Sequence, residues 1–490
     1  MGGYHGHRQV QEYIREHKKT ILAIVFIILI LYGLLIRLYS LGLESFWVDE
    51  SISALAARRI LEVGVPRFES NYLYSRASLF HYLMAGFLLF GYTEFNARLV
   101  SVIFGIASSV LIFFIAREYN KQAAWIALLL SLFLEVFVVY SRQARMYQME
   151  MFFFFLTLYL LYKALWKKTY LWWAALCFLA AYNTHTIALL LLPFFFYALF
   201  RHRLSRLVYA ISAMFSIYLV YSHLHLLGDF RLPFLTTYMI YLKHYAPFLL
   251  VSVVGFFIGC FGSFKPTRGS KRASGKESKK LTNESRRTLT CFLGLAAILI
   301  LAAASFERMF AFRYVYLAFL PILVLTSVAF SRIKYGWLIV TAYLVLISNI
   351  FIPFTYTSIL RPESRISHFD FTAPEADFRQ AYSVIDQIYE GEALIASFTP
   401  AAAWYFKSPD YWIHASFTSL NDSTIYNDRD VYTGARVIYN LEQLKAVKGH
   451  KLIILDQWSG SKIKGDIRDF IQESCTERVS EEGVVGFRCG

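Results

Sequence analysis

The stretch that decides the fold is ILAIVFIILILYGLLIRL, residues Ile21–Leu38. It is apolar throughout except for Arg37 next to its end. As an α-helix it would be about 27 Å long, close to the thickness of the hydrocarbon core of a bilayer. In lipid every backbone polar group has to be paired within the segment, which favours a helix. Comparable apolar runs recur along the chain, so the sequence predicts an α-helical polytopic membrane protein.

The composition and the charge distribution agree with this class. Of the 490 residues, 57% are hydrophobic, and the mean hydropathy is +0.45, which excludes an ordinary soluble protein. The net charge is +15, yet the segment from Pro362 to the end has 13 Lys and Arg against 19 Asp and Glu. The basic excess therefore lies in the apolar part, where Lys and Arg mark cytoplasmic loops and meet anionic membrane lipids. We expect no nucleic-acid partner.

The positions of Lys and Arg predict about eleven transmembrane helices, with the N-terminus in the cytoplasm and the C-terminus outside. Residues 1–20 form a cytoplasmic tail, and residues 263–288 form a flexible basic loop on the same side. The predicted spans are Ile21–Leu38, Arg98–Ile115, Ala123–Tyr140, Met151–Leu165, Tyr170–Tyr182, Ile187–Phe200, Val208–Leu224, Tyr238–Phe261, Thr290–Ala304, Tyr314–Phe330 and Trp337–Phe354.

One apolar segment, Leu79–Phe90, is too short to cross a bilayer. We therefore expect residues 41–95 to form one outer loop, with interfacial helices at Ser51–Val63 and Arg76–Phe90. If Leu79–Phe90 crossed the membrane, every later loop would change sides and the most basic loop would face outward. The charge bias argues against that arrangement.

The last part of the chain, residues 359–490, is predicted to be a small extracytoplasmic α/β domain. Leu394–Phe398 and Leu452–Leu455 are short apolar runs of the kind found in buried parallel strands. Ala376–Ile388 and Lys462–Gln472 have the pattern of amphipathic helices. The membrane domain then covers residues 21–358.

Five cysteines are present, and three of them, Cys177, Cys260 and Cys291, lie in or beside apolar spans, where they are expected to be small buried hydrophobic residues. The other two, Cys475 and Cys489, lie close together in the last domain. They could form a disulfide if this domain is outside the cell. Whether their geometry allows it is left open by the sequence.

Polar side chains gather on the predicted outer face. The acidic pair Asp49-Glu50 follows the first span closely, and several arginines come from other outer turns. Arginine suits phosphate because its planar group can donate two parallel hydrogen bonds, and a nearby carboxylate can take a proton from an attacking hydroxyl. This pattern indicates an enzyme that acts on lipid-linked substrates. The candidates besides the acidic pair are Arg76, Arg142, Arg145, Tyr147, His185, Arg313 and Tyr314.

Three motifs occur in a fixed order: FWVDE at residues 46–50, YSRQARMY at residues 140–147, and RY at residues 313–314, which is followed by Pro321. In this order they resemble the GT-C glycosyltransferases, particularly the protein O-mannosyltransferases and the aminoarabinose transferases of lipid A. The resemblance covers roughly residues 20–355. It implies a GT-C fold, with residues 21–358 as the catalytic membrane domain.

The resemblance implies a polyprenyl- or dolichyl-phosphate monosaccharide as donor, and a protein, lipid or glycan acceptor on the outer face. Transfer would invert the anomeric carbon in a single displacement. Asp49 matches the catalytic aspartate of the family, the base for the acceptor hydroxyl, with Glu50 as a second catalytic candidate. Arg76 falls near the family's cation that precedes a double proline, although no proline follows it here. Gln143 stands where the family often has glutamate, so the resemblance implies no metal at that turn; the sequence requires no cofactor and leaves a divalent cation open.

Each candidate also has a plainer interpretation. Asp49 could cap the helix that begins at Ser51, the arginines could reach the interface as ordinary flanking residues, and Tyr147 could belong to an aromatic belt. For the whole chain, the alternatives are a transporter or flippase of lipid-linked sugars and a non-catalytic membrane assembly protein. A transporter usually has paired halves and ionisable groups near the midplane, whereas here the polar groups gather on one face.

Overall fold

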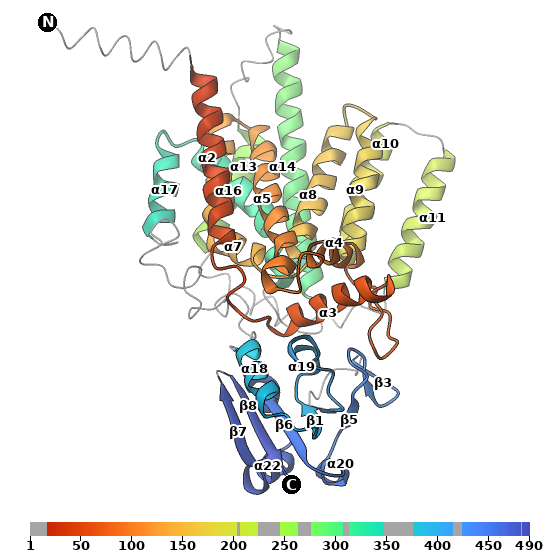
Figure 1. Cartoon of the computed structure of the whole chain (residues 1–490). Helices are drawn as coiled ribbons and strands as arrows, with labels where there is room; N and C mark the ends of the chain where they lie inside the picture. Colours follow the sequence, from red (N-terminus) through yellow and green to blue (C-terminus); the bar gives the residue numbers. More distant parts are fainter. Residues whose placement is uncertain are drawn as a thin grey trace, which may run out of the picture.

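The computed structural model describes residues 17–202, 206–223, 246–262, 276–306, 313–346, 376–414, 424–481 and 483–490. Apolar helices up to residue 346 form a helical domain, and residues 376–490 form a C-terminal unit. Figure 1 shows the two stacked, with α3 (Val48–Val63) and α4 (Ser78–Leu88) lying crosswise between them. The other helices are α2 (Lys18–Leu38), α5 (Glu94–Arg117), α6 (Lys121–Phe133), α7 (Glu135–Ser141), α8 (Tyr147–Ala164), α9 (Tyr170–Thr184), η1 (Thr186–Leu191), α10 (Leu192–Arg201), α11 (Arg206–His223), α13 (Ala246–Phe261), α14 (Lys276–Ala304), α15 (Arg313–Tyr316), α16 (Phe319–Phe330) and α17 (Gly336–Leu346).

The helical domain has the features of an integral multi-pass membrane protein. Among the described residues, α2, α5 and α14 are long and apolar enough to cross a bilayer, and the bent pair α6 and α7 makes a fourth candidate. Ile28 and Leu35 of α2 are more than half exposed, as lipid-facing side chains are. Each predicted span overlaps a helix, but the count of eleven stays a prediction.

The predicted span Ala123–Tyr140 consists of two helices, because the chain bends by 55° between α6 and α7. The bend leaves carbonyl groups at the end of α6 without partners in the helix. Arg37 of α2 donates hydrogen bonds to two of them, that of Leu132 at 2.9 Å and that of Ser131 at 3.2 Å. Arg37 is fully buried, so the single charge in the first span stabilises the bend in a neighbouring one.

The prediction of a flexible loop at residues 263–288 is wrong for residues 276–288, which are helical. Helix α14 begins at Lys276 and continues without interruption to Ala304. Residues 276–287 contain neither Gly nor Pro and are rich in Lys, Glu and Arg, which favour helices. The helix therefore extends beyond its apolar part. Residues 263–275 lie outside the described residues.

The C-terminal unit contains an eight-stranded sheet in the order β3-β4-β5-β2-β1-β6-β8-β7. Its helices are α18 (Phe378–Ile388), α19 (Thr399–Tyr405), α20 (Leu441–Ala446), α21 (Gln457–Gly460) and α22 (Gly465–Ser474). Its strands are β1 (Ala393–Ala396), β2 (Tyr411–Ile413), β3 (Ile425–Tyr426), β4 (Arg429–Asp430), β5 (Arg436–Ile438), β6 (Lys451–Asp456), β7 (Thr476–Glu481) and β8 (Val484–Cys489).

The two strands predicted from the sequence, β1 and β6, lie side by side and are parallel, with Leu394 opposite Leu452. Successive side chains of a strand point to opposite faces of the sheet. Leu394 and Leu452 accordingly pack with α18 and α19, whereas Ile395 and Ile453 pack with α20 and α22. The apolar runs are therefore buried on both faces, as parallel strands usually are.

The cysteines of the C-terminal unit are paired. Cys475 and Cys489 form a disulfide, with their Cα atoms 4.4 Å apart. It ties the residue before β7 to the last residue of β8, two antiparallel neighbours at the edge of the sheet. Cys177, Cys260 and Cys291 are free thiols, and the expectation that they are buried is wrong, because Cys177 and Cys260 are partly exposed and Cys291 is exposed.

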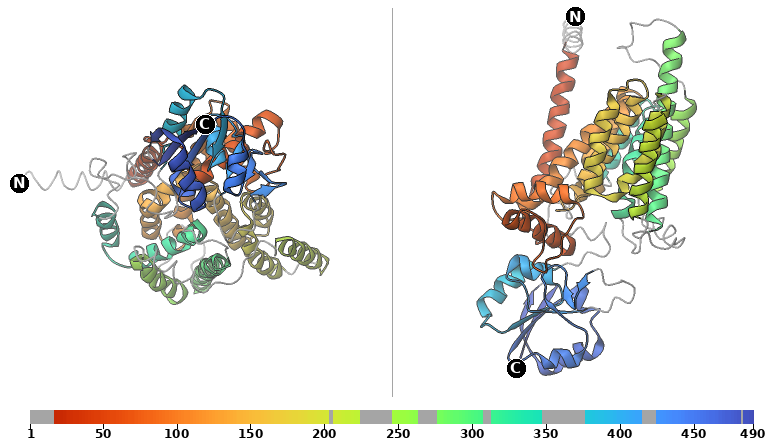
Figure 2. Two further views of the ribbon diagram at one scale, coloured as in Figure 1. Left: turned by 90° about the horizontal axis from the view of Figure 1, so that it is seen from below. Right: turned by 90° about the vertical axis from the view of Figure 1, so that its right-hand side faces the viewer.

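The C-terminal unit is hydrogen-bonded to the segment that precedes α3 and to the start of α5. Arg379 of α18 donates hydrogen bonds to the Glu94 carboxylate at 2.9 Å and to the Gly42 carbonyl at 2.9 Å. Tyr405 of α19 donates to the same carboxylate at 2.8 Å and accepts the backbone N–H of Phe46 at 2.6 Å. The right-hand view of Figure 2 shows the unit directly beneath the crosswise helices. These contacts fix residues 42–46 immediately before α3.

We expect Glu94→Ala to loosen this attachment, because two donors then lose their common acceptor. The free energy of unfolding should fall by about 1–3 kcal/mol. Hydrogen–deuterium exchange should rise in α18 and α19. Glu62→Ala is the matched control, since within the described residues Glu62 pairs only with Arg58 and Arg59 of its own helix, on its exposed side. Unchanged exchange in Glu94→Ala would show that the attachment lies elsewhere.

Candidate active site

Asp49 lies in the first turn of α3 without capping it. The residue at the N-cap is Trp47, and its backbone N–H donates to the carboxylate of Glu50 at 3.3 Å. The plainer interpretation of Asp49 as a helix cap is therefore wrong. Its negative charge at the N-terminal end of a helix is favourable, and its side chain is left to contact other elements.

Two arginines from distant parts of the chain meet the Asp49 carboxylate. Arg145, in the turn before α8, approaches Oδ2 at 3.5 Å, and Arg313, at the start of α15, approaches the same oxygen at 3.3 Å. Both contacts are made to Oδ2, and Oδ1 has no hydrogen bond or ion pair with another residue that the structure describes. The side chain is 22% exposed. One oxygen of Asp49 is thus held, and the other is open to a proton donor.

The charges around Asp49 fix its protonation state. Burial by itself raises the pKa of a carboxyl group, but Arg145, Arg313 and Arg76 together hold the pKa of Asp49 below its ordinary value. Asp49 is therefore ionised at neutral pH. One carboxylate faces three guanidinium groups, so the site keeps a surplus of positive charge that favours an anionic ligand.

Arg145 is anchored by several contacts to α3. It is buried, and its Nη1 donates to the Asp49 carbonyl at 3.0 Å and to Ser53 Oγ at 2.9 Å. Arg76, by contrast, is exposed and makes no side-chain hydrogen bond or ion pair within the part of the chain that the structure describes. Its charge still acts on Asp49. Arg145 therefore positions the carboxylate, whereas Arg76 is available to a ligand.

The two predicted tyrosines lie beside the arginines. The guanidinium carbon of Arg145 is 5.7 Å from the ring centre of Tyr147, and that of Arg313 is 5.5 Å from the ring centre of Tyr314. Arg313 also lies 6.0 Å from the ring centre of Trp47. Such cation–π contacts hold a guanidinium group in place without neutralising its charge.

Glu50 lies apart from this cluster, although it is the next residue. It is fully buried, and Arg98 of α5 donates to its two oxygens at 2.9 and 2.8 Å. The backbone N–H of Ala144 donates to Glu50 as well, at 2.5 Å. With all its partners inside the protein, Glu50 joins α3, α5 and the turn that carries Arg145. This geometry favours a positioning role over contact with substrate.

Arg142 is also placed away from Asp49. Its guanidinium group donates to the carbonyls of Ile36 at 3.1 Å, Arg37 at 3.0 Å and Tyr39 at 2.6 Å, at the C-terminal end of α2. These carbonyls have no partner within their helix, and a cation there is favourable. The structure thus places Arg142 as a cap of α2 and not beside the carboxylate.

His185 is at the edge of the site as a neutral imidazole. Its Nδ1 accepts the backbone N–H of Ile187 at 3.2 Å, so that nitrogen carries no proton. Burial, with Arg76 and Arg145 nearby, lowers the pKa of His185 to about 3. The 3.6 Å contact with Glu150 is therefore not an ion pair at neutral pH. His185 has a proton on Nε2 to donate, but no positive charge.

Two residues that hold the site were missed by sequence reasoning. Ser53 lies one turn after Asp49, and a spacing of four residues would have placed both on one face of a helix. Arg98 begins an apolar span, where an ionisable residue needs a partner. Within the described ranges, no group of three or more His, Cys, Asp or Glu side chains is placed to hold a metal ion.

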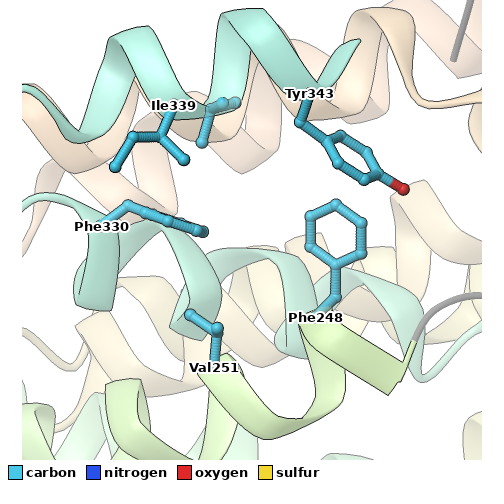
Figure 3. Close-up of a pocket in the computed structure, with 6 residues that line it drawn as sticks. Phe248, Val251, Phe330, Ile339 and Tyr343 are labelled. Carbon is cyan, nitrogen blue, oxygen red and sulfur yellow. The ribbon is translucent and has the colours of Figure 1, made fainter. Parts of the chain in front are cut away.

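A separate apolar pocket of about 80 Å³ lies between α13, α16 and α17 (Figure 3). None of its side chains is charged, and none was predicted as a site residue. The pocket suits an apolar group, and none of its lining residues belongs to the cluster around Asp49. Its lining residues are Phe248, Val251, Phe330, Ile339, Val340 and Tyr343.

Known proteins resemble this chain in sequence and in structure. Residues 75–225 match the family described as dolichyl-phosphate-mannose-protein mannosyltransferase. An uncharacterised protein of Aquifex aeolicus (strain VF5) is 28% identical over 159 residues, which is 31% of this chain. The match spans only 32% of that relative.

Among solved structures, ArnT from Cupriavidus metallidurans bound to undecaprenyl phosphate superposes with a TM-score of 0.57 and 13% identity, over 95% of this chain and 98% of that one. The same protein in its apo state gives a TM-score of 0.55 over the same shares of the two chains. At this identity the likeness concerns the fold. The shared fold and the family match over residues 75–225 confirm the predicted resemblance of this chain to the GT-C glycosyltransferases.

Proposed function

We propose that the chain is a membrane glycosyltransferase that moves a monosaccharide from a polyprenyl- or dolichyl-phosphate donor to a hydroxyl group of a protein, lipid or glycan acceptor. The observation that carries this proposal is the half-buried carboxylate of Asp49 between Arg145 and Arg313. The structure of ArnT with undecaprenyl phosphate, a protein of the same fold, supports a lipid phosphate as the leaving group.

Binding of the donor phosphate to Arg145 and Arg313 activates the base. Guanidinium groups that hold Asp49 in the free protein are also well suited to phosphate. A bound lipid phosphate competes with Asp49 for Arg145 and Arg313. As those contacts are given up, the pKa of Asp49 rises and its carboxylate becomes a better proton acceptor. Donor binding and activation of the base are thereby coupled.

The reaction is a single displacement. The acceptor oxygen attacks the anomeric carbon from the side opposite the phosphate, and its proton passes to Oδ1 of Asp49. The bond between the anomeric carbon and the phosphate oxygen breaks, and the lipid phosphate leaves with the electron pair. Arg145, Arg313 and the exposed Arg76 stabilise the negative charge of the leaving group. One displacement inverts the configuration of the anomeric carbon.

The proposed topology places residues 1–20 in the cytoplasm and residues 359–490 outside, with the catalytic domain at residues 21–358 between them. The disulfide between Cys475 and Cys489 supports an oxidising compartment for the C-terminal unit. In that orientation α3 and α4 lie on the outer side, and the sugar is transferred there.

We expect Arg313→Ala to weaken donor binding, because Arg313 pairs with the Asp49 carboxylate and lies beside aromatic rings. The KM for the lipid-phosphate sugar should rise about 10- to 100-fold, the usual effect of one lost contact to a charged group. The measurement is the initial rate of lipid phosphate release against donor concentration. Arg142→Ala is the matched control: it removes an arginine that contacts backbone carbonyls, and the donor KM should not change. An equal rise in both variants would contradict the phosphate role of Arg313.

The same assay separates the alternatives. A transporter or flippase would move the donor without consuming it, so wild-type protein would release no lipid phosphate. A non-catalytic assembly protein would also leave the donor intact. Release that depends on the chain supports the transferase.

A further inference from the structure

The C-terminal unit presents a turn, residues 430–434, to the first outer loop. The hydroxyl of Ser70 donates to the carbonyl of Val431, and the ring of Tyr432 lies edge-on to Phe68 with the ring centres 5.4 Å apart. Gly434 has φ +76° and lies against the backbone of Ser70, where a side chain would be strained. The turn is therefore shaped to fit the outer loop.

The turn is fixed from inside by a buried carboxylate. Asp430 accepts hydrogen bonds from the hydroxyl of Thr399 at 2.6 Å and from the hydroxyl and N–H of Thr433 at 2.7 and 2.9 Å. Thr399 is the first residue of α19, which packs on α3. The position of Tyr432 is thus set relative to the helix that carries Asp49.

A row of aromatic rings leads from this turn to α4. Phe68 is 5.4 Å from Tyr74, and Tyr74 is 5.4 Å from His81 of α4. Burial raises the pKa of Tyr432 well above its ordinary value, and the charges of Asp49 and Arg76 act on it as well. Tyr74 and Tyr432 also pack against an apolar cluster that contains Ile52, Leu55 and Ala56 of α3, one to two turns after Asp49.

Three polar groups near Tyr432 have no hydrogen-bond partner among the described residues. The hydroxyls of Tyr74 and Tyr432 and the guanidinium group of Arg76 make no hydrogen bond to any residue in the described ranges, and none of these atoms is both buried and unsatisfied. Donors and acceptors left open beside a catalytic carboxylate are available to a ligand.

We infer that Tyr432 is a specificity-determining residue of the acceptor site, contributed by the C-terminal unit to the catalytic centre of the helical domain. The inference rests on the proposed function. The lipid tail brings the donor phosphate from the membrane side, and an in-line displacement requires the acceptor to come from the opposite side. The C-terminal unit covers that side (Figure 1). With Arg76 beside Tyr432 and Tyr74, it suits a neutral or anionic acceptor group that carries hydroxyls.

The test uses the purified full chain in detergent, a radiolabelled lipid-phosphate-sugar fraction as donor, and a membrane extract from cells lacking the chain as acceptor. Transfer to the extract and hydrolysis of the donor by water are measured separately. For Tyr432→Ala, we expect the amount of extract that gives half-maximal transfer to rise about tenfold, the effect of one lost polar contact, with donor hydrolysis unchanged. Tyr432→Phe keeps the ring and should raise it about threefold.

Tyr426→Ala is the control, because Tyr426 is 62% exposed on β3 of the same unit. It should leave both rates unchanged. The inference is overturned if Tyr432→Ala lowers hydrolysis as much as transfer, since the residue is then structural, or if neither Tyr432 variant changes transfer. If Tyr432→Ala does not fold, Tyr432→Phe decides. Wild-type protein that neither transfers nor hydrolyses the donor would remove the proposed function itself, and the inference with it.

Discussion

Asp49→Asn is expected to lower kcat for sugar transfer by about 10²- to 10⁴-fold, because asparagine has the shape of aspartate but cannot take the acceptor proton. The KM for the donor should stay the same or fall, since Arg145 and Arg313 lose the carboxylate that competes with phosphate. The measurement is the rate of lipid phosphate release by purified protein at several donor concentrations. A variant that keeps more than a tenth of the wild-type kcat would contradict the assignment of the base.

The pH dependence gives a second check on Asp49. Its pKa is held below the ordinary value, so the free protein keeps its base ionised as the pH falls. The kcat/KM should therefore stay constant down to about pH 4, where an aspartate with an unperturbed pKa is already about half protonated. Arg313→Ala removes one of the charges that lower this pKa, and its acid limb should move to higher pH. An acid limb that is the same in both proteins would speak against the electrostatic coupling.

Glu50→Ala is expected to destabilise the protein by about 3–5 kcal/mol, because it leaves the buried charge of Arg98 without a carboxylate, with only backbone carbonyls of the described residues as acceptors. The N–H groups of Trp47 and Ala144 lose their acceptor at the same time. The measurement is thermal or denaturant unfolding of the purified chain in detergent. The double variant Glu50→Leu with Arg98→Leu should recover part of the loss, since it removes both buried charges.

Glu50→Gln separates a positioning role from a catalytic one. Glutamine can still accept from Arg98, so the protein should fold with lower stability and retain a kcat far above that of Asp49→Asn. If Glu50→Gln has wild-type stability and loses transfer as completely as Asp49→Asn, Glu50 belongs to the catalytic residues that the sequence suggests.

The helices and strands follow largely from local patterns. The apolar run Ile21–Leu38 is α2, and the short runs at Leu394–Phe398 and Leu452–Leu455 lie in parallel neighbouring strands. Periodicity and length suffice there, because burial in lipid or in a sheet core acts on each segment by itself. The meeting of Asp49 with Arg145 and Arg313 was also predictable, from the order of motifs and from a topology that puts them on one face.

The different roles of adjacent residues become clear only from the tertiary structure. Asp49 and Glu50 are neighbours in one helix, and the packing of α5 decides that Glu50 is buried on Arg98 while Asp49 stays partly exposed. Arg142 is turned toward the end of α2 for a similar reason. Such roles depend on which helix lies opposite, and this information is not local.

Contacts between segments that lie far apart in the sequence could not be predicted from the sequence. Tyr405 and Tyr432 lie more than 350 residues after Asp49, in a unit whose docking on α3 depends on many contacts at once. The bend at Leu134 is a further case, because the backbone breaks where Arg37 of another helix can satisfy the freed carbonyls. Composition shows the charge in the span but not its partner.

The central claim is tested most directly by incubating the purified full chain with a lipid-phosphate-sugar fraction and an acceptor extract from cells lacking the chain. Mass spectrometry then measures the lipid phosphate released and the mass gained by the acceptor. The account predicts that wild-type protein releases lipid phosphate and adds one monosaccharide to an acceptor in equal amounts, and that Asp49→Asn does neither. No release by the wild type, or equal transfer by Asp49→Asn, would contradict it.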